Sequence, residues 1–88
     1  MPHSLRIVVQ LIHESNGSVY RLVVYGGTHR YQPARFTRLE DLLAVLSLAL
    51  PAFDPATIAV DHGERRTRII FSGDFELNEE QLRRLGVA

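Results

Sequence analysis

Residues 37–51 read TRLEDLLAVLSLALP and contain the longest apolar run of the chain. Apolar side chains recur there at helical spacing, which gives a helix one hydrophobic stripe for packing. Thr37 followed by Glu40 predicts a capping box at the start of this helix. Pro51 has no amide hydrogen, so the helix should end just before it. The stripe consists of Leu39, Leu42, Leu43, Leu46 and Leu50.

A β-hairpin is predicted ahead of this helix. Apolar and polar residues alternate over residues 5–11, as in a strand with one buried face, and a second strand is expected over residues 19–25. Asn16-Gly17 between them is a strong hairpin signal. A two-residue loop there would pair Leu11 with Leu22. One face of the hairpin would then be apolar apart from His13, and it comprises Ile7, Val9, Leu11, Tyr20, Leu22 and Val24.

Two further strand regions are expected. Residues 28–36 could return as a third strand, which Pro33 would restrict to a sheet edge because proline lacks a ladder donor. Residues 57–60 and 66–71 look like a second hairpin that turns at Asp61-His62-Gly63-Glu64. Ser72-Gly73-Asp74 should break the second strand of that hairpin.

The chain closes with a short predicted helix. Asn78 and Gln81 are suited to its start, Arg83 and Arg84 to its last turn, and Gly86 to its end. The fold class is therefore α+β in the order ββ(β)-α-ββ-α. We expect an antiparallel hairpin or three-stranded sheet packed on a central helix, followed by a second hairpin and the C-terminal helix.

Length and composition favour one small globular domain over residues 1–88. The chain is 45% hydrophobic and 23% charged, which argues against disorder. It has no cysteine, which excludes a disulfide scaffold and a thiolate site. The N-terminus lacks the pattern of a signal peptide, and no apolar run is long enough to cross a bilayer. We expect a cytoplasmic protein without membrane contact.

The charges are arranged in blocks. The net charge is zero, and all ten basic side chains are arginines. Residues 1–38 carry five arginines and one acid, whereas residues 39–64 carry five acids and no arginine. Blocks of alternating sign favour internal or intersubunit ion pairs over binding to a polyanion.

No residue pattern indicates catalysis, a metal or a cofactor. His62 could act as a base oriented by Asp61 or Glu64, but a solvated polar turn explains that cluster better. Gly26-Gly27 lacks the rest of a phosphate-binding loop. We therefore expect a protein that is not an enzyme and has no cofactor. Metal-ligand spacing is absent among the four histidines, which are His3, His13, His29 and His62.

Nucleic-acid binding is an alternative function. The hairpin pattern places Arg6, Gln10, Arg21 and Tyr25 on its outer face, and Arg30 could join them. Arginines around an exposed aromatic are typical of sheets that bind single-stranded nucleic acid. The zero net charge argues against this function, since such domains are usually basic.

The leading hypothesis rests on surplus apolar residues. The outer hairpin face also carries β-branched residues, and two apolar residues of the central helix lie off its main stripe. Either the second hairpin and the C-terminal helix cover them, or a partner subunit does. We predict a non-catalytic protein–protein interaction domain that is homodimeric. Its expected contact residues are Val8, Ile12, Arg21, Val23, Tyr25, Val45 and Leu48. No family resemblance is evident in the residues.

Overall fold

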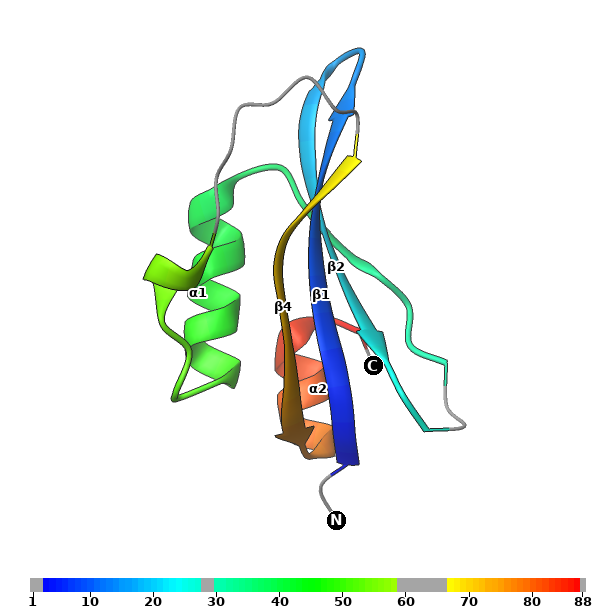
Figure 1. The fold of residues 1–88 in the computed structure, drawn as a ribbon, viewed down its shortest axis with the longest axis vertical. Helices are drawn as coiled ribbons and strands as arrows, with labels where there is room; N and C mark the ends of the chain where they lie inside the picture. Colours follow the sequence, from blue (N-terminus) through cyan, green and yellow to red (C-terminus); the bar gives the residue numbers. More distant parts are fainter. Residues whose placement is uncertain (1–2, 28–29, 59–66, 88) are drawn as a thin grey trace.

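One antiparallel sheet and two helices form the fold (Figure 1). The computed structural model describes residues 3–27, 30–58 and 67–87. The four strands lie in the order β3-β2-β1-β4, so β1 and β2 are central and β4 is an edge. This arrangement confirms the α+β prediction. The elements are β1 (His3–Glu14), β2 (Gly17–Tyr25), β3 (Ala34–Phe36), α1 (Leu39–Ala49), the 3₁₀ turn η1 (Pro55–Thr57), β4 (Thr67–Leu77) and α2 (Glu79–Leu85).

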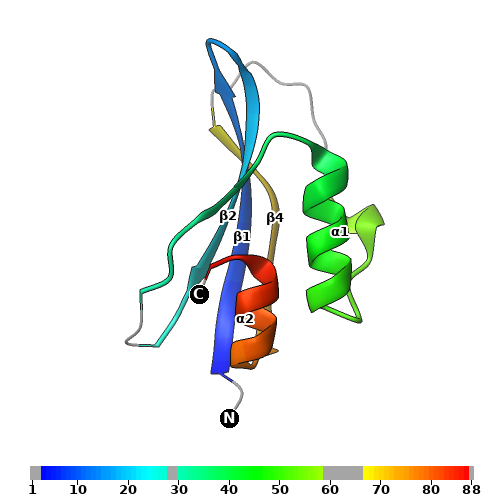
Figure 2. The same ribbon diagram turned by 180° about the vertical axis from the view of Figure 1, so that it is seen from behind.

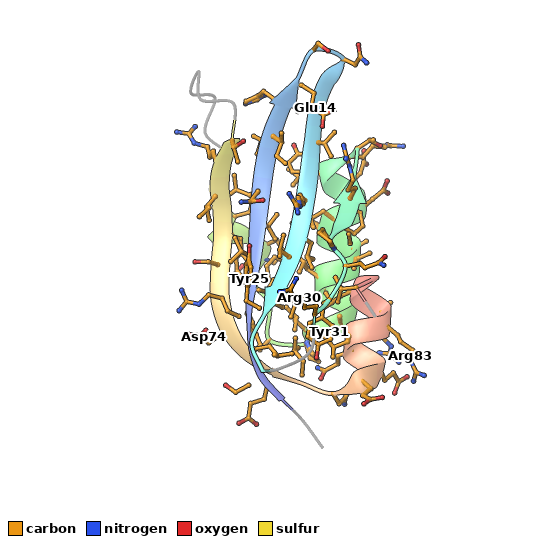
Figure 3. The ribbon with its side chains drawn as sticks, turned by 90° about the vertical axis from the view of Figure 1, so that its right-hand side faces the viewer. Glu14, Tyr25, Arg30, Tyr31, Asp74 and Arg83 are labelled. Carbon is orange, nitrogen blue, oxygen red and sulfur yellow. The ribbon has the colours of Figure 1, made fainter. Side chains whose placement is uncertain are left out.

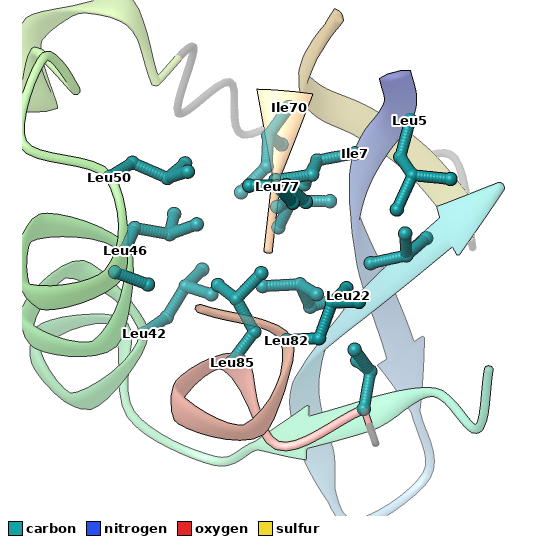
Figure 4. Packing of buried hydrophobic residues seen from close by; sticks show 14 of the residues in the cluster. Leu5, Ile7, Leu22, Leu42, Leu46, Leu50, Ile70, Leu77, Leu82 and Leu85 are labelled. Carbon is teal, nitrogen blue, oxygen red and sulfur yellow. The ribbon is translucent and has the colours of Figure 1, made fainter. Parts of the chain in front are cut away.

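Both helices lie on the same side of the sheet (Figure 2). The inner sheet face and the apolar stripes of α1 and α2 enclose one hydrophobic core, seen from close by in Figure 4. No described segment packs on the opposite sheet face, so α2 does not cover it. The completely buried side chains of the core include Ile7, Val9, Leu22, Leu42, Leu46, Leu77 and Leu85.

Helix α1 confirms the predicted element and its end, but its predicted cap is wrong. The helix ends at Ala49, and Leu50 donates its amide to the carbonyl of Leu46. Arg38, not Thr37, is the N-cap residue, and no side chain caps the helix. The Glu40 carboxylate instead accepts a hydrogen bond from Nε of Arg38 at 2.8 Å. Because the helix begins after Arg38, Glu40 is its second residue and not the third, which is the position that a capping box requires.

The β1–β2 hairpin exists, but its predicted register is wrong by two residues. Leu11 lies opposite Tyr20, not Leu22, and Glu14 lies opposite Gly17. The predicted loop would have needed a positive φ at Asn16, and no described residue other than glycine has one. The loop therefore forms one position earlier, and Gly17 takes φ +124°. A shift of two residues leaves every side chain on its predicted face.

The remaining strand predictions need correction. The third strand, β3, is confined to Ala34–Phe36, after Pro33. It lies at an edge of the sheet, as expected. Ser72-Gly73-Asp74 does not break β4, which continues through them to Leu77 and pairs with β1. The long neighbouring strand supplies ladder partners that outweigh the local turn tendency of these residues. The predicted turn at 61–64 lies outside the described residues, and Thr57 belongs to the 3₁₀ turn η1.

Helix α2 begins and ends as predicted. The Asn78 side chain accepts a hydrogen bond from the Gln81 amide, and the Gln81 side chain accepts one from the Asn78 amide, each at 2.8 Å. This reciprocal pair is a complete capping box. Gly86 ends the helix, and Leu82 and Leu85 reach the core. Gln81 also donates to the carbonyl of Ala49, which ties α2 to the end of α1.

Candidate interaction surface

The structure divides the predicted contact residues between two sides of the molecule. Val45 and Leu48 belong to α1, on the helical side. Val45 is half-buried against the core, whereas Leu48 is 64% exposed. The other five lie on the sheet face that no described segment covers, and they are Val8, Ile12, Arg21, Val23 and Tyr25. The seven residues therefore do not form one continuous surface.

We call the uncovered side of the sheet the open face (Figure 3). Because the odd residues of β1 from Leu5 to Leu11 enter the core, its even residues and their cross-strand neighbours point the other way. The open face comprises Arg6, Val8, Gln10, Ile12 and Glu14 of β1, Val19, Arg21, Val23 and Tyr25 of β2, Arg35 of β3, and Ile69, Ser72, Asp74 and Glu76 of β4.

The centre of the open face is apolar and its border is partly exposed. Val8 and Val23 are only 8% and 7% exposed, because neighbouring side chains of the same face surround them. Ile12 and Val19 are half-buried. Tyr25 and Ile69 are 52% and 61% exposed, so these two large side chains are the apolar groups that a docked partner would newly cover.

Two ion pairs neutralise much of the charge on the open face. Arg6 donates two hydrogen bonds to the Asp74 carboxylate, at 3.0 and 3.1 Å. Arg35 pairs with Glu14 at 3.0 Å. Hydrogen bonding and charge attraction from Arg6 lower the pKa of Asp74. Arg21 has no ion-pair partner in the described part of the chain, and it is the face's available cation.

The Arg6–Asp74 pair makes stability depend on acidity. The pKa of Asp74 is lower in the folded protein, so the pair's contribution is present above the unfolded-state pKa and lost as pH falls through the lowered one. We expect wild type to lose slightly more stability than Asp74→Asn between about pH 5 and about pH 2. Urea unfolding at both pH values measures this. Equal losses would contradict it, and added salt should shrink the difference because both groups are exposed.

A further polar pair lies at the end of the β1–β2 hairpin. The Nδ1 atom of His13 lies 2.9 Å from the Ser18 hydroxyl across the hairpin. Both residues are near the hairpin end, and no third group orients the imidazole in the hydrogen bonds of the described residues. His62 with Asp61 and Glu64 lies outside the described residues, as does His29. The described residues also contain no cluster of three potential metal ligands.

The sequence prediction missed a groove beside β4. It has a volume of about 420 Å³ and is lined by Thr57, residues 69–73 and Phe75. The Phe71 and Phe75 rings are stacked with centroids 6.0 Å apart, and Phe53 meets Phe71 edge-on at 5.4 Å. The alternation of Phe71, Gly73, Phe75 and Leu77 across the expected break is the signal that could have revealed this strand.

The chain matches no known family model, and no curated protein or solved structure is significantly similar to it. In the part of the chain that the structure describes, no helix has the length and apolar character needed to span a membrane.

Proposed function

We propose that this protein is a small, non-catalytic protein–protein interaction domain that acts as a homodimer in the cytoplasm and presents its open face to a protein partner. The observation that carries this proposal is the sheet whose second face no described segment covers. Its centre is aliphatic, and its exposed side chains include Tyr25, Arg21 and Ile69. Tyrosine and arginine around a desolvated centre are the residue types that dominate binding energy at protein interfaces.

The charge of the open face favours a protein partner over a polyanion. Two of its three arginines are already paired with carboxylates of the same face. Arg6, Arg21 and Arg35 are balanced by Glu14, Asp74 and Glu76. A partner with an apolar patch and a carboxylate for Arg21 would complement this surface.

Nucleic-acid binding is a second candidate, and the position of Arg21 favours it. Arg21 has no ion-pair partner among the described residues and lies on the same face as the exposed Tyr25. Arg6 and Arg30 would be further contacts. This function requires binding to single-stranded oligonucleotides that weakens steeply with salt. A flat fluorescence titration at low salt would exclude it.

The partner-binding role is tested by Tyr25→Glu with Leu48→Glu as the matched control. Each variant adds one acid at an exposed site, on the open face and on α1 respectively. The partner is first identified by cross-linking in source cells, and its affinity for each purified variant is then measured. We expect Tyr25→Glu to lower the affinity for this partner about 30-fold, as loss of a hot-spot tyrosine does. Leu48→Glu should bind as wild type does. Equal binding by all three proteins would contradict a role for the open face.

A further inference from the structure

Strand β4 forms a long edge of the sheet in the described part of the chain. It contains 11 residues and is the last strand on its side of the sheet. Figure 3 shows β4 at the border of the sheet, and no described strand pairs with its outer side. On such an edge every second residue directs its N–H and C=O groups away from the sheet, which makes the edge a template for another strand. A register shift opposite Val9 and Gln10 disturbs the first half of β4, so its regular part is residues 71–77.

We infer that two copies of this chain pair through β4, antiparallel, about a two-fold axis at Gly73. This inference rests on the homodimer proposed above and specifies its interface. Each copy contributes the same strand, as a closed two-fold interface requires. The two four-stranded sheets then become one continuous sheet of eight strands.

The aromatic residues of β4 support this register. Phe71 lies opposite Val9 and Phe75 opposite Leu5, so both rings are on the inner face. With Gly73 at the axis, Phe71 of each copy lies directly across from Phe75 of the other. Cross-strand aromatic pairs of this kind stabilise antiparallel sheets. The four rings would cover the groove beside β4, whose lining already includes both residues.

Gly73 is suited to the position on the axis. A Cβ atom built on it would lie 2.9 Å from the Phe75 ring and 3.7 Å from the Phe71 ring. The two rings therefore occupy the space in front of its backbone. A residue with a side chain at this position would separate the rings and meet its own copy across the axis.

The acidic residues of β4 disfavour the neighbouring registers. An axis at Asp74 would place Asp74 opposite itself, and an axis at Phe75 would place Asp74 opposite Glu76. Like charges directly opposite each other destabilise a strand pair. An axis at Ser72 would replace the paired rings with Phe71 opposite Gly73. With the axis at Gly73, Asp74 faces Ser72, so of these four registers only this one combines ring pairs with no acid–acid contact.

Pairing through β4 would place the open faces of both copies on one side of the dimer. A two-fold axis perpendicular to the sheet leaves the two open faces side by side on the same surface. The helices of both copies lie together on the other surface. The dimer therefore presents one doubled, continuous open face, with Tyr25 of each copy on it.

A matched pair of substitutions at Ser72 tests the register. Ser72 is exposed on the open face. In the dimer, Ser72 of each copy lies opposite Asp74 of the other, so the interface contains two such pairs. Two pairs of about 0.7 kcal/mol each correspond to about a tenfold change in the dimer dissociation constant, up for Ser72→Glu and down for Ser72→Arg. Sedimentation equilibrium measures both constants. Thermal unfolding of each variant at low concentration checks that the monomer still folds.

Cross-linking provides an independent test, because the natural chain has no cysteine. Residues directly opposite each other in an antiparallel pair have Cα atoms about 4.5 to 5.5 Å apart, within the usual disulfide range. An oxidised mixture of Ser72→Cys and Asp74→Cys should yield the mixed disulfide in excess over either homodimer. Leu48→Cys, on α1, should not cross-link.

The outcomes separate the interface from the proposed homodimer. A wild-type monomer at high concentration would overturn both. A dimer that Ser72→Glu leaves intact would overturn pairing through β4, and its dissociation by Tyr25→Glu would assign the homodimer to the open face instead. Equal effects of Ser72→Glu and Ser72→Arg would also overturn the register, since an Asp74 side chain opposite position 72 would give them opposite signs.

Discussion

Replacing Leu46 with alanine is expected to lower the free energy of unfolding by about 3 kcal/mol, the middle of the range for a buried leucine. Leu46 is completely buried, and Figure 4 shows its side chain pointing from α1 into the core. Truncation removes apolar contacts and leaves a cavity that its neighbours fill only partly. A domain of this size has a total stability of only about 5–10 kcal/mol, so the loss is a large fraction of it.

The control for this prediction is Leu48→Ala in the same helix. Leu48 is 64% exposed, and alanine has the higher helix propensity, so we expect a change within about 0.5 kcal/mol. Urea unfolding followed by circular dichroism measures both variants. Similar losses at the two positions would mean that α1 does not pack on the sheet through the face described here.

The second large effect is expected for Gly26→Ala, which should destabilise the protein by about 2 kcal/mol. Gly26 follows β2 and has φ +133°, a conformation that residues with a side chain rarely adopt. An added Cβ would also lie 2.9 Å from a methyl carbon of Leu5 and 3.3 Å from the Ser4 carbonyl oxygen. The strain and the crowding act together, because Leu5 is a buried residue of the core and has little room to move.

Gly27→Ala separates these two causes. Gly27 has φ +66°, and a Cβ on it would meet nothing within 4 Å. This substitution adds strain without crowding, so we expect a smaller cost of about 1 kcal/mol. Thermal unfolding monitored by circular dichroism compares the two variants. A Gly27→Ala cost equal to or above that of Gly26→Ala would show that the contact with Leu5 and Ser4 is unimportant.

The predictions that succeeded depend on neighbours in the sequence. Four residues of the predicted α1 stripe that reach the core, the end of that helix before Pro51 and the cap of α2 involve residues within one or two helical turns. Leu43 of the predicted stripe is not part of the core cluster, whereas Val45 packs against it. The inner face of the β1–β2 hairpin was also predictable, because alternation of side chains is a property of each strand by itself. The predicted cap of α1 failed because the helix begins one residue later than expected, and residue types alone do not fix a helix boundary to one residue.

The candidate site was less predictable than the fold. The sequence placed Tyr25 and Arg21 together on one hairpin face, and they do share the open face. It could not show that Arg6 and Asp74, 68 positions apart, form an ion pair, nor that Leu48 lies on the other side of the molecule. Those relations depend on β4 joining the sheet beside β1.

The sequence by itself determined the helices, the apolar faces of the first two strands and the α+β class, since periodicity and end signals act over short distances. The tertiary structure alone decided the hairpin register, the continuous strand β4 and the sheet edge that β4 forms beside its aromatic groove. The reason is that residues 72–74 have the local character of a turn, whereas the ladder with β1 offers hydrogen bonds and packing that only the folded chain brings together.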